Sequence, residues 1–546
     1  MVNATQLPFT HRVRRVALGG ILAVSLAGST ALASPQLAFA DTGSVTINSV
    51  DNEGAIYNAY QFFTADVDNE NNATHFAFGA GVSGEALATF LNNYGYATWL
   101  TDNSKGAADN AQNQAEFISE QIGKSAGANS PVWVNSETFA DELAHWAVTN
   151  LGGQAKTATE GTAFTDNEGY YLFVSSQIDE EGGIGTAPIW FPLGGSATTI
   201  DEKASAPTVS KTIIEDSDAI KYTDVEINDE VTYQVTTTLP GNYHTFDSFY
   251  YQVADNVPAG MTVDTSKVAV MHGDTNITDQ FVINVGQDNK LTITAEDLKA
   301  LNEDFNSGDT ITITYTVDLN DLDEIVFGGT GNINGATLTY SNNPYTTDHG
   351  TVDSEKTYVY TFQISLDKTD ASTGVPLEGA SFIVNNEEGK YLVADGDSYS
   401  WTAEKAGATQ FTTDENGNIA QMPGLDAGKY TLTETVAPDN YVVPGLLGSL
   451  ASFDLTVTPA YNEETGELTG LNASVSTNAA LNPSIAPDGI DVSQGMINID
   501  VTNDRVISLA LTGAQGAGLV GVIVIAAGAA IYLYRRFQTS QESKAE

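Results

Sequence analysis

The chain of 546 residues is strongly acidic, with 70 Asp and Glu residues against 21 Lys and Arg and a formal net charge of -49 at pH 7. Nucleic acid phosphates and anionic lipids would repel such a chain, so the composition excludes nucleic acid binding. Cysteine is absent, and disulfides therefore cannot hold the domains together.

The first 40 residues have the layout of a cleavable secretory signal. Three arginines precede an apolar run over residues 16–32, and Ala38 and Ala40 place small residues two apart before Asp41. We predict that residues 1–40 are removed and that the mature chain is exported. Its length of about 465 residues suggests roughly three domains.

Residues 41–202 are expected to form an α+β domain. Residues 45–47 and 170–173 have the pattern of strands, and a helix is predicted from Ser136 because apolar residues recur after it at intervals of three and four. His145 lies beside the apolar face of that helix. We interpret it as a packed or surface histidine, since no second ligand lies at metal spacing.

Residues 203–355 and 356–506 are each expected to form a β-sandwich. Strand-like runs with a period of two are separated by clusters of Asn, Asp and Gly, over residues 231–235, 310–315 and 336–340 in the first segment and 362–366, 380–384, 429–434 and 497–501 in the second. The predicted fold class is therefore mainly β, with tandem immunoglobulin-like antiparallel β-sandwich domains after an α+β N-terminal domain.

Residues 508–546 have three parts in order. The motif Leu509-Ala510-Leu511-Thr512-Gly513 comes first, an uncharged apolar run over residues 514–534 follows, and Arg535-Arg536 come next. About twenty apolar residues can cross the ~30 Å hydrocarbon core as one helix, and arginines after it favour a cytoplasmic end. We predict a C-terminal transmembrane helix over residues 514–534, so that the precursor is membrane-bound.

This tail resembles the cell-wall sorting signal of Gram-positive surface proteins, in which a sortase cleaves an LPXTG motif between Thr and Gly. The resemblance implies cleavage after Thr512 and transfer of the Thr512 carbonyl to an amine, with a sortase and peptidoglycan as partners. Ala510 stands where the family has proline. A permanent single-pass anchor is the alternative interpretation.

The segment 356–506 looks like a B-type domain of the collagen-adhesin and Gram-positive pilin families. Its opening strand reads Ile364-Ser365-Leu366-Asp367-Lys368-Thr369-Asp370, a later strand carries Glu434, and its last strand ends Val501-Thr502-Asn503-Asp504. The resemblance implies a self-formed isopeptide bond between Lys368 and Asn503, helped by Glu434.

The physical argument for that bond is separate. Burial in an apolar sandwich disfavours the charge of a lysine and frees a nucleophilic amine, and the same desolvation keeps a carboxyl protonated, so that it can polarise an amide and carry a proton. Taken one at a time, Lys368 would be a surface strand lysine, Glu434 a solvated carboxylate and Asn503 a turn former.

The segment 203–355 is similar to the fimbrial isopeptide-forming domain of pilin backbone subunits. The resemblance rests on the stretches 207–213, 251–260 and 338–344. It implies that Lys211 attacks an asparagine with Asp255 as the helping carboxyl. Asn342 is the chosen asparagine and Asn343 the alternate, because the sequence does not fix which amide points inward.

A linker lysine completes the candidate residues. Backbone pilins carry a lysine near the end of the first domain, usually in a Tyr-Pro-Lys-Asn context, whose amine resolves the sortase intermediate of the next subunit. The corresponding residue is Lys203, four residues before Pro207, although its surroundings differ from that context. A solvated linker lysine is the alternative.

No metal site or cofactor is expected. Residues 414–418 have alternate oxygen side chains like a calcium loop, but the glycine is misplaced and Leu425 stands where that loop has Glu, so a hairpin turn explains them better.

These resemblances imply a structural subunit of a covalently polymerised surface pilus (fimbria), anchored to the cell wall and supporting adhesion. The partners would be a sortase, other copies of the chain, peptidoglycan and a host surface ligand. The chain would not be an enzyme, apart from autocatalytic isopeptide formation. The alternatives are an unpolymerised or accessory wall-anchored adhesin that binds a host ligand, and a wall-bound hydrolase.

Overall fold

The computed structural model describes residues 42–49, 54–68, 72–122, 136–178, 181–194, 197–201, 205–396, 398–441, 451–478 and 480–504. The predicted signal (1–40), Lys203, the motif 509–513 and the predicted transmembrane helix (514–534) lie outside these residues. No helix within the described ranges is long and apolar enough to span a bilayer. The side chain of Ser136, predicted to cap a helix, is also outside the description.

The N-terminal part has a central sheet with a layer on each face. The sheet has the order β3-β2-β6-β7, with β4 beside β2, and a second sheet has the order β5-β1-β8. The strands are β1 (Thr42–Asn48), β2 (Ile56–Val67), β3 (Ala73–Phe78), β4 (Lys156–Thr159), β5 (Ala163–Asn167), β6 (Gly169–Gln177), β7 (Ile189–Leu193) and β8 (Thr198–Asp201). The helices are α1 (Gly84–Asn92), α2 (Tyr96–Asp102), α3 (Ala111–Ile122) and α4 (Ser136–Leu151).

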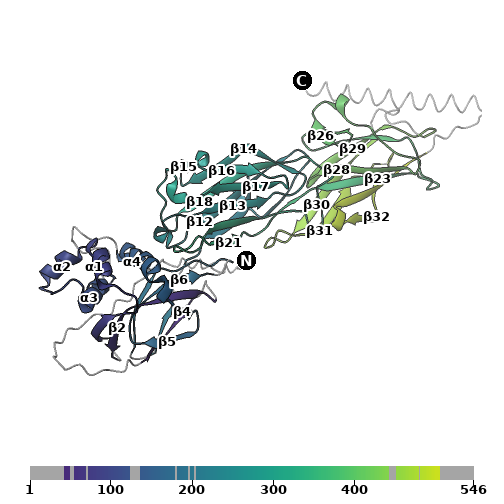
Figure 1. Ribbon diagram of the computed structural model, residues 1–546. Helices are drawn as coiled ribbons and strands as arrows, with labels where there is room; N and C mark the ends of the chain where they lie inside the picture. Colours follow the sequence, from purple (N-terminus) through teal and green to yellow (C-terminus); the bar gives the residue numbers. More distant parts are fainter. Residues whose placement is uncertain are drawn as a thin grey trace, which may run out of the picture. The chain divides into compact units, whose positions relative to one another are not determined.

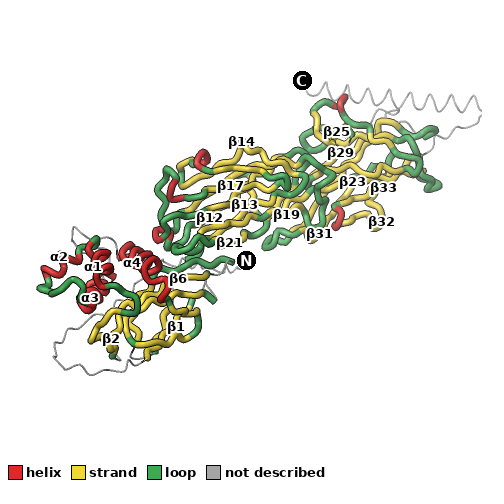
Figure 2. Tube along the Cα trace, viewed as in Figure 1, coloured by secondary structure: helices red, strands yellow, loops and turns green. Residues whose placement is uncertain are grey.

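Alternation along β2 and β6 explains these layers. Phe62 of β2 and Leu172 of β6 share a core with the four helices. Tyr57 and Phe173, at odd positions of the same strands, share a second core with the small sheet. Because successive strand side chains point to opposite faces, a sheet covered on both sides needs apolar residues at every position. The α+β prediction is confirmed, and the helices gather in this part of the chain (Figures 1 and 2).

The next part consists of strands and single-turn helices. One sheet has the order β10-β9-β12-β18-β14-β15, a second β16-β17-β13-β20-β21, and a small third β11-β22-β19. The strands are β9 (Thr208–Glu215), β10 (Asp218–Ile220), β11 (Tyr222–Asp224), β12 (Glu230–Thr238), β13 (Tyr251–Asn256), β14 (Met261–His272), β15 (Thr275–Asn276), β16 (Val282–Val285), β17 (Lys290–Ala295), β18 (Thr310–Leu319), β19 (Asn332–Asn334), β20 (Ala336–Ser341), β21 (His349–Asp353) and β22 (Thr357–Tyr360). In β12 and β18 every second residue is buried, as predicted for a sandwich.

The last part is also built from two sheets. One has the order β28-β23-β33-β32 and the other β26-β25-β24-β29-β30-β31, with β27 beside β24. The strands are β23 (Phe362–Asp370), β24 (Ser381–Asn385), β25 (Tyr391–Asp395), β26 (Ser398–Thr402), β27 (Phe411–Thr412), β28 (Asn418–Leu425), β29 (Gly428–Val436), β30 (Ala451–Tyr461), β31 (Leu468–Val475), β32 (Ser484–Asp491) and β33 (Met496–Asn503). The first strand, β23, runs parallel to the last, β33, along its whole length. The mainly β class is confirmed.

The chain divides into two compact units. The first contains residues up to Thr361 together with the segments 424–426 and 461–469, and the second contains the remainder from Phe362. Each candidate site described next lies within one unit.

Candidate cross-linking sites

The first candidate site joins the two ends of the last sandwich. Register pairs Lys368 of β23 with Val501 of β33, and Asn503 is the next residue of β33 that faces inward. Glu434 reaches the same place from β29 in the facing sheet. Lys368, Glu434 and Asn503 are at most 3% exposed, so all three polar side chains lie inside the sandwich.

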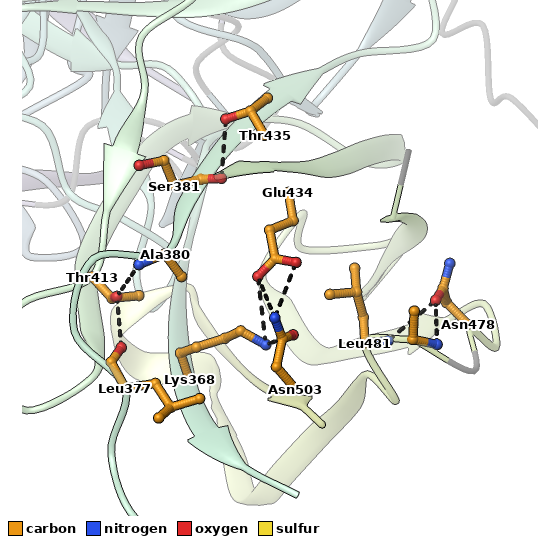
Figure 3. Close-up of polar contacts among 11 residues, drawn as sticks. Lys368, Leu377, Ala380, Ser381, Thr413, Glu434, Thr435, Asn478, Leu481 and Asn503 are labelled. Carbon is orange, nitrogen blue, oxygen red and sulfur yellow. Dashed lines mark hydrogen bonds and ion pairs between the residues drawn. The ribbon is translucent and has the colours of Figure 1, made fainter. Parts of the chain in front are cut away.

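The three side chains contact one another directly (Figure 3). The Lys368 amine donates to Asn503 Oδ1 and lies 3.7 Å from Glu434 Oε1. The amide nitrogen of Asn503 donates to both oxygens of Glu434, at 3.1 and 3.3 Å. The carboxyl therefore lies next to both nitrogens, and the amine lies next to the amide group.

Burial pushes both titratable groups of this site toward their neutral forms. Desolvation lowers the pKa of Lys368 to about 8, against the partial opposing effect of Glu434. Desolvation also raises the pKa of Glu434 above its ordinary value. A neutral amine is a nucleophile and a protonated carboxyl is an acid, so both pKa shifts favour the protonation that attack on an amide requires.

A turn fixes the backbone of Lys368. The Lys368 N–H donates to Gly417 O at 2.7 Å, and Leu377 N–H donates to Lys368 O at 2.9 Å. Gly417 has a φ of +78°, and a Cβ there would overlap the carbonyl oxygen of Lys368. The predicted turn is present, but it is not a hairpin, because it joins β27 and β28, which belong to different sheets. The Asp414 carboxylate accepts from the backbone N–H groups of Asn416 and Asn418 at 2.9 and 2.8 Å.

The second candidate site lies inside the middle sandwich. Lys211 of β9 and Asp255 of β13 form a buried ion pair between the two sheets. The amine also donates to the hydroxyl of Tyr315 of β18 at 2.5 Å. It lies 4.3 Å from the ring centre of Tyr233, which stacks on Tyr315. Burial lowers the pKa of Lys211 to about 8, although Asp255 opposes the shift.

The structure does not bring Asn342 to Lys211, which corrects the sequence prediction. In the β13–β20 register Asp255 pairs with Ala336, so Asn342 lies six residues further along the strand direction, or about 20 Å at ~3.3 Å per residue. The backbone carbonyl oxygen of Asn342 accepts from Gly185 N–H at 2.6 Å. The alternate, Asn343, donates to Ser175 O at 3.3 Å and is no nearer.

The asparagine at this site is Asn334, which the sequence analysis missed. Asn334 is fully buried, and its amide nitrogen donates to the hydroxyl of Tyr315 at 3.0 Å. Two oxygens at the site, Asp255 Oδ1 and Asn334 Oδ1, accept no hydrogen bond from the described residues. Alternation along the sequence places both Asn334 and Asn342 on an inward side. In the structure Asn334 ends β19 of the small third sheet, whereas Asn342 follows β20 of the second sheet.

His145 packs against the ring of Tyr345, in agreement with its interpretation as a packed histidine. Its ring lies 5.2 Å from that of Tyr345, and its Nε2 atom is 3.8 Å from Asp247. Within the part of the chain that the structure describes, no three His, Cys, Asp or Glu side chains are grouped to hold a metal ion.

Comparison with known proteins places the chain near Gram-positive pilins. Residues 362–445 match the model of the SpaA prealbumin-like fold domain. The trypsin-resistant surface T6 protein of Streptococcus pyogenes serotype M6 is 26% identical over 260 residues, which cover 44% of this chain and 44% of that protein. The chain thus spans less than half the length of that curated relative.

Solved structures show the same likeness in fold. The T6 backbone pilin of Streptococcus pyogenes serotype M6, described as having a modular three-domain structure, superimposes with a TM-score of 0.53 at 16% identity, covering 86% of this chain and all of that one. The full-length major pilin SpaD of Corynebacterium diphtheriae gives a TM-score of 0.46 at 17% identity, covering 86% and 99%. The match to the T6 backbone pilin shows that the chain has a similar fold.

Proposed function

We propose that this chain, which resembles Gram-positive backbone pilins in sequence and fold, is the structural subunit of a covalently polymerised pilus on the cell surface. The observation that carries the proposal is the contact of Lys368, Glu434 and Asn503, buried where the first and last strands of the sandwich meet. A subunit that is pulled from its ends needs such a connection.

The chemistry at that contact is an amide exchange. Lys368 first loses a proton to Glu434, and its neutral Nζ attacks Cγ of Asn503. The Nζ–Cγ bond forms, the Cγ–Nδ2 bond breaks, and Glu434 carries the second Nζ proton to Nδ2, which leaves as ammonia. Because the fold already holds the amine beside the amide, the reaction gains the high effective concentration of intramolecular processes.

A bond at this place would stabilise the sandwich against unfolding. It would close a loop of residues separated by 135 positions, and the chain-entropy estimate for crosslinks gives about 5 kcal/mol for a loop this long. We propose a second bond, between Lys211 and Asn334 with Asp255 as the helping carboxyl, that closes the middle sandwich in the same way. The mature chain would then consist of three domains, 41–202, 203–355 and 356–506, two of them covalently closed.

Polymerisation would use a different pair of residues. A sortase would cleave after Thr512 and pass its carbonyl to Lys203 of the next copy, and the last copy would be passed to peptidoglycan. The names of the matched proteins, a surface T6 protein and a T6 backbone pilin, support this role. On this account the precursor is held in the membrane by residues 514–534 and the product is a shaft on the cell wall.

A denaturing gel of boiled cell-wall extracts tests the proposal. The wild-type chain should give a ladder of multiples, and Lys203→Ala should reduce it to a single species. Lys156→Ala is the matched control, because Lys156 is a half-exposed lysine of the same N-terminal part and forms an ion pair with Asp166. A single band in the wild type would instead support an unpolymerised wall adhesin.

A further inference from the structure

The two candidate sites differ in which group lies beside the leaving nitrogen. At the first site the amide nitrogen of Asn503 donates to Glu434, which is also the carboxyl nearest the amine. At the second site the amide nitrogen of Asn334 donates to the hydroxyl of Tyr315. The carboxyl at this site is that of Asp255, and its Oδ2 atom accepts a hydrogen bond from the Lys211 amine.

This difference matters because amide exchange requires a proton to travel between two nitrogens. The attacking amine must lose a proton, and the amide nitrogen must gain one before it can leave as ammonia. The hydroxyl oxygen of Tyr315 is 2.5 Å from Lys211 Nζ and 3.0 Å from Asn334 Nδ2. It is thus within hydrogen-bond reach of both nitrogens, as a group that carries a proton from one to the other must be.

We propose that Tyr315 is a catalytic residue of bond formation in the middle sandwich and that its hydroxyl carries the proton from Lys211 to the leaving nitrogen of Asn334. The proposal rests on the Lys211–Asn334 bond proposed above. Lys211 gives its first proton to Asp255 and attacks Cγ of Asn334. As the Cγ–Nδ2 bond breaks, the Tyr315 oxygen accepts the second Nζ proton and its own O–H proton passes to Nδ2. Ammonia leaves, and Tyr315 ends the reaction neutral.

The surroundings of Tyr315 suit a neutral, fixed hydroxyl. The residue is 1% exposed, on a strand that pairs with β12 on one side and β14 on the other. Its ring stacks on Tyr233 at 5.3 Å between centres. Burial, with Asp255 nearby, raises the pKa of Tyr315 well above its ordinary value, so the resting group keeps its proton and can donate it.

The test is the rate at which each bond forms in newly made protein. The full chain is synthesised in a cell-free system, synthesis is stopped, and the cross-linked peptides are measured by mass spectrometry over time. Tyr315→Phe keeps the ring and removes only the hydroxyl. We expect it to slow the Lys211–Asn334 bond by about 100-fold, the size of a typical general acid–base contribution. The Lys368–Asn503 bond of the same molecules should form at the wild-type rate.

Tyr251→Phe is the matched control, since Tyr251 has a fully buried, hydrogen-bonded hydroxyl in the same sandwich, 2.8 Å from Thr237. It should leave both rates unchanged. Equal slowing in Tyr251→Phe and Tyr315→Phe would mean a packing effect and would overturn the relay. Formation of the bond in Tyr315→Phe at the wild-type rate would overturn the relay alone, whereas a free Lys211 in the wild type would overturn the bond as well.

Discussion

The chemistry proposed for this chain depends on two lysines that the fold keeps out of water. An exposed lysine has a pKa near 10.4 and is almost fully protonated at neutral pH. Lys211 and Lys368 have a pKa lowered to about 8 by burial. Lys211 contacts Asp255 and the hydroxyl of Tyr315, and Lys368 contacts the amide oxygen of Asn503 and lies 3.7 Å from Glu434. A few per cent or more of neutral amine is then present at neutral pH, which suffices for a reaction that occurs once per molecule.

The first prediction at this scale concerns mass. The mature chain over residues 41–504, made without sortase, should be lighter than its sequence by two molecules of ammonia, because each bond releases one. Glu434→Ala should lose only one, since the Asn503 amide no longer has an acid beside it. Glu388→Ala removes an exposed carboxylate of the same sandwich that pairs with Lys390 and should leave the deficit at two. Intact-mass spectrometry of unlabelled protein decides, and a wild type of full mass contradicts both bonds.

The second prediction concerns pH. In the reactive form of the Lys368–Glu434 pair the amine is neutral and the carboxyl is protonated, so the pair holds one titratable proton. Below the pKa of Glu434, which burial raises, a second proton converts the amine to ammonium, and above about pH 8, the lowered pKa of Lys368, the last proton leaves. The rate of Lys368–Asn503 bond formation should therefore be bell-shaped, with its alkaline limb near pH 8. Cell-free synthesis followed by a pH jump measures it, and a rate that rises steadily beyond pH 10 would be inconsistent.

At the scale of elements, strand register decides which residues can react. The β23–β33 register places Asn503 one inward position beyond the partner of Lys368, whereas the β13–β20 register carries Asn342 about 20 Å away from Asp255. Alternation alone marks both Asn334 and Asn342 as inward-facing, although the first ends β19 and the second follows β20 in another sheet. Register is a long-range property of strand pairing, and nothing local in the sequence specifies it.

The third prediction separates the two asparagines. Asn334→Ala should abolish the Lys211 cross-link, because it removes the amide beside Tyr315, and should leave the Lys368 cross-link intact. Asn342→Ala, the matched control at another buried asparagine of the same part of the chain, should retain both. Peptide mapping after proteolysis identifies the partner of each lysine. Loss of the Lys211 bond in Asn342→Ala but not in Asn334→Ala would restore the choice made from the sequence.

The same contrast shows how much the sequence could predict. The mainly β class and the α+β start followed from periodicity, since two-residue alternation in strands such as β12 survives in the structure. The motifs of the opening and last strands, through the family resemblance, predict Lys368, Glu434 and Asn503 together, and the structure brings them into contact. Asn334 has no such motif, and Tyr315 lies in an ordinary strand pattern, Thr310–Leu319. Their proximity arises only when two sheets face each other.

At the scale of the whole molecule, the proposed bonds determine how the chain responds to force. A sandwich without a cross-link can be pulled open from its ends until its residues are extended. With Lys368 joined to Asn503, the residues between them are outside the path of the force and cannot extend. This is the property that a shaft requires, and it follows from the position of the reacting residues on the first and last strands.

The fourth prediction measures that property directly. In single-molecule stretching of the mature chain, the last sandwich should show no unfolding step in the wild type. Asn503→Ala leaves the loop of 135 residues open, and at ~3.4 Å per residue its unfolding should release about 460 Å of chain. Asn498→Ala changes an outward-facing asparagine of the same strand and should behave as the wild type. A wild-type chain that releases the same length as Asn503→Ala would show that its first and last strands are not covalently joined, whatever their proximity.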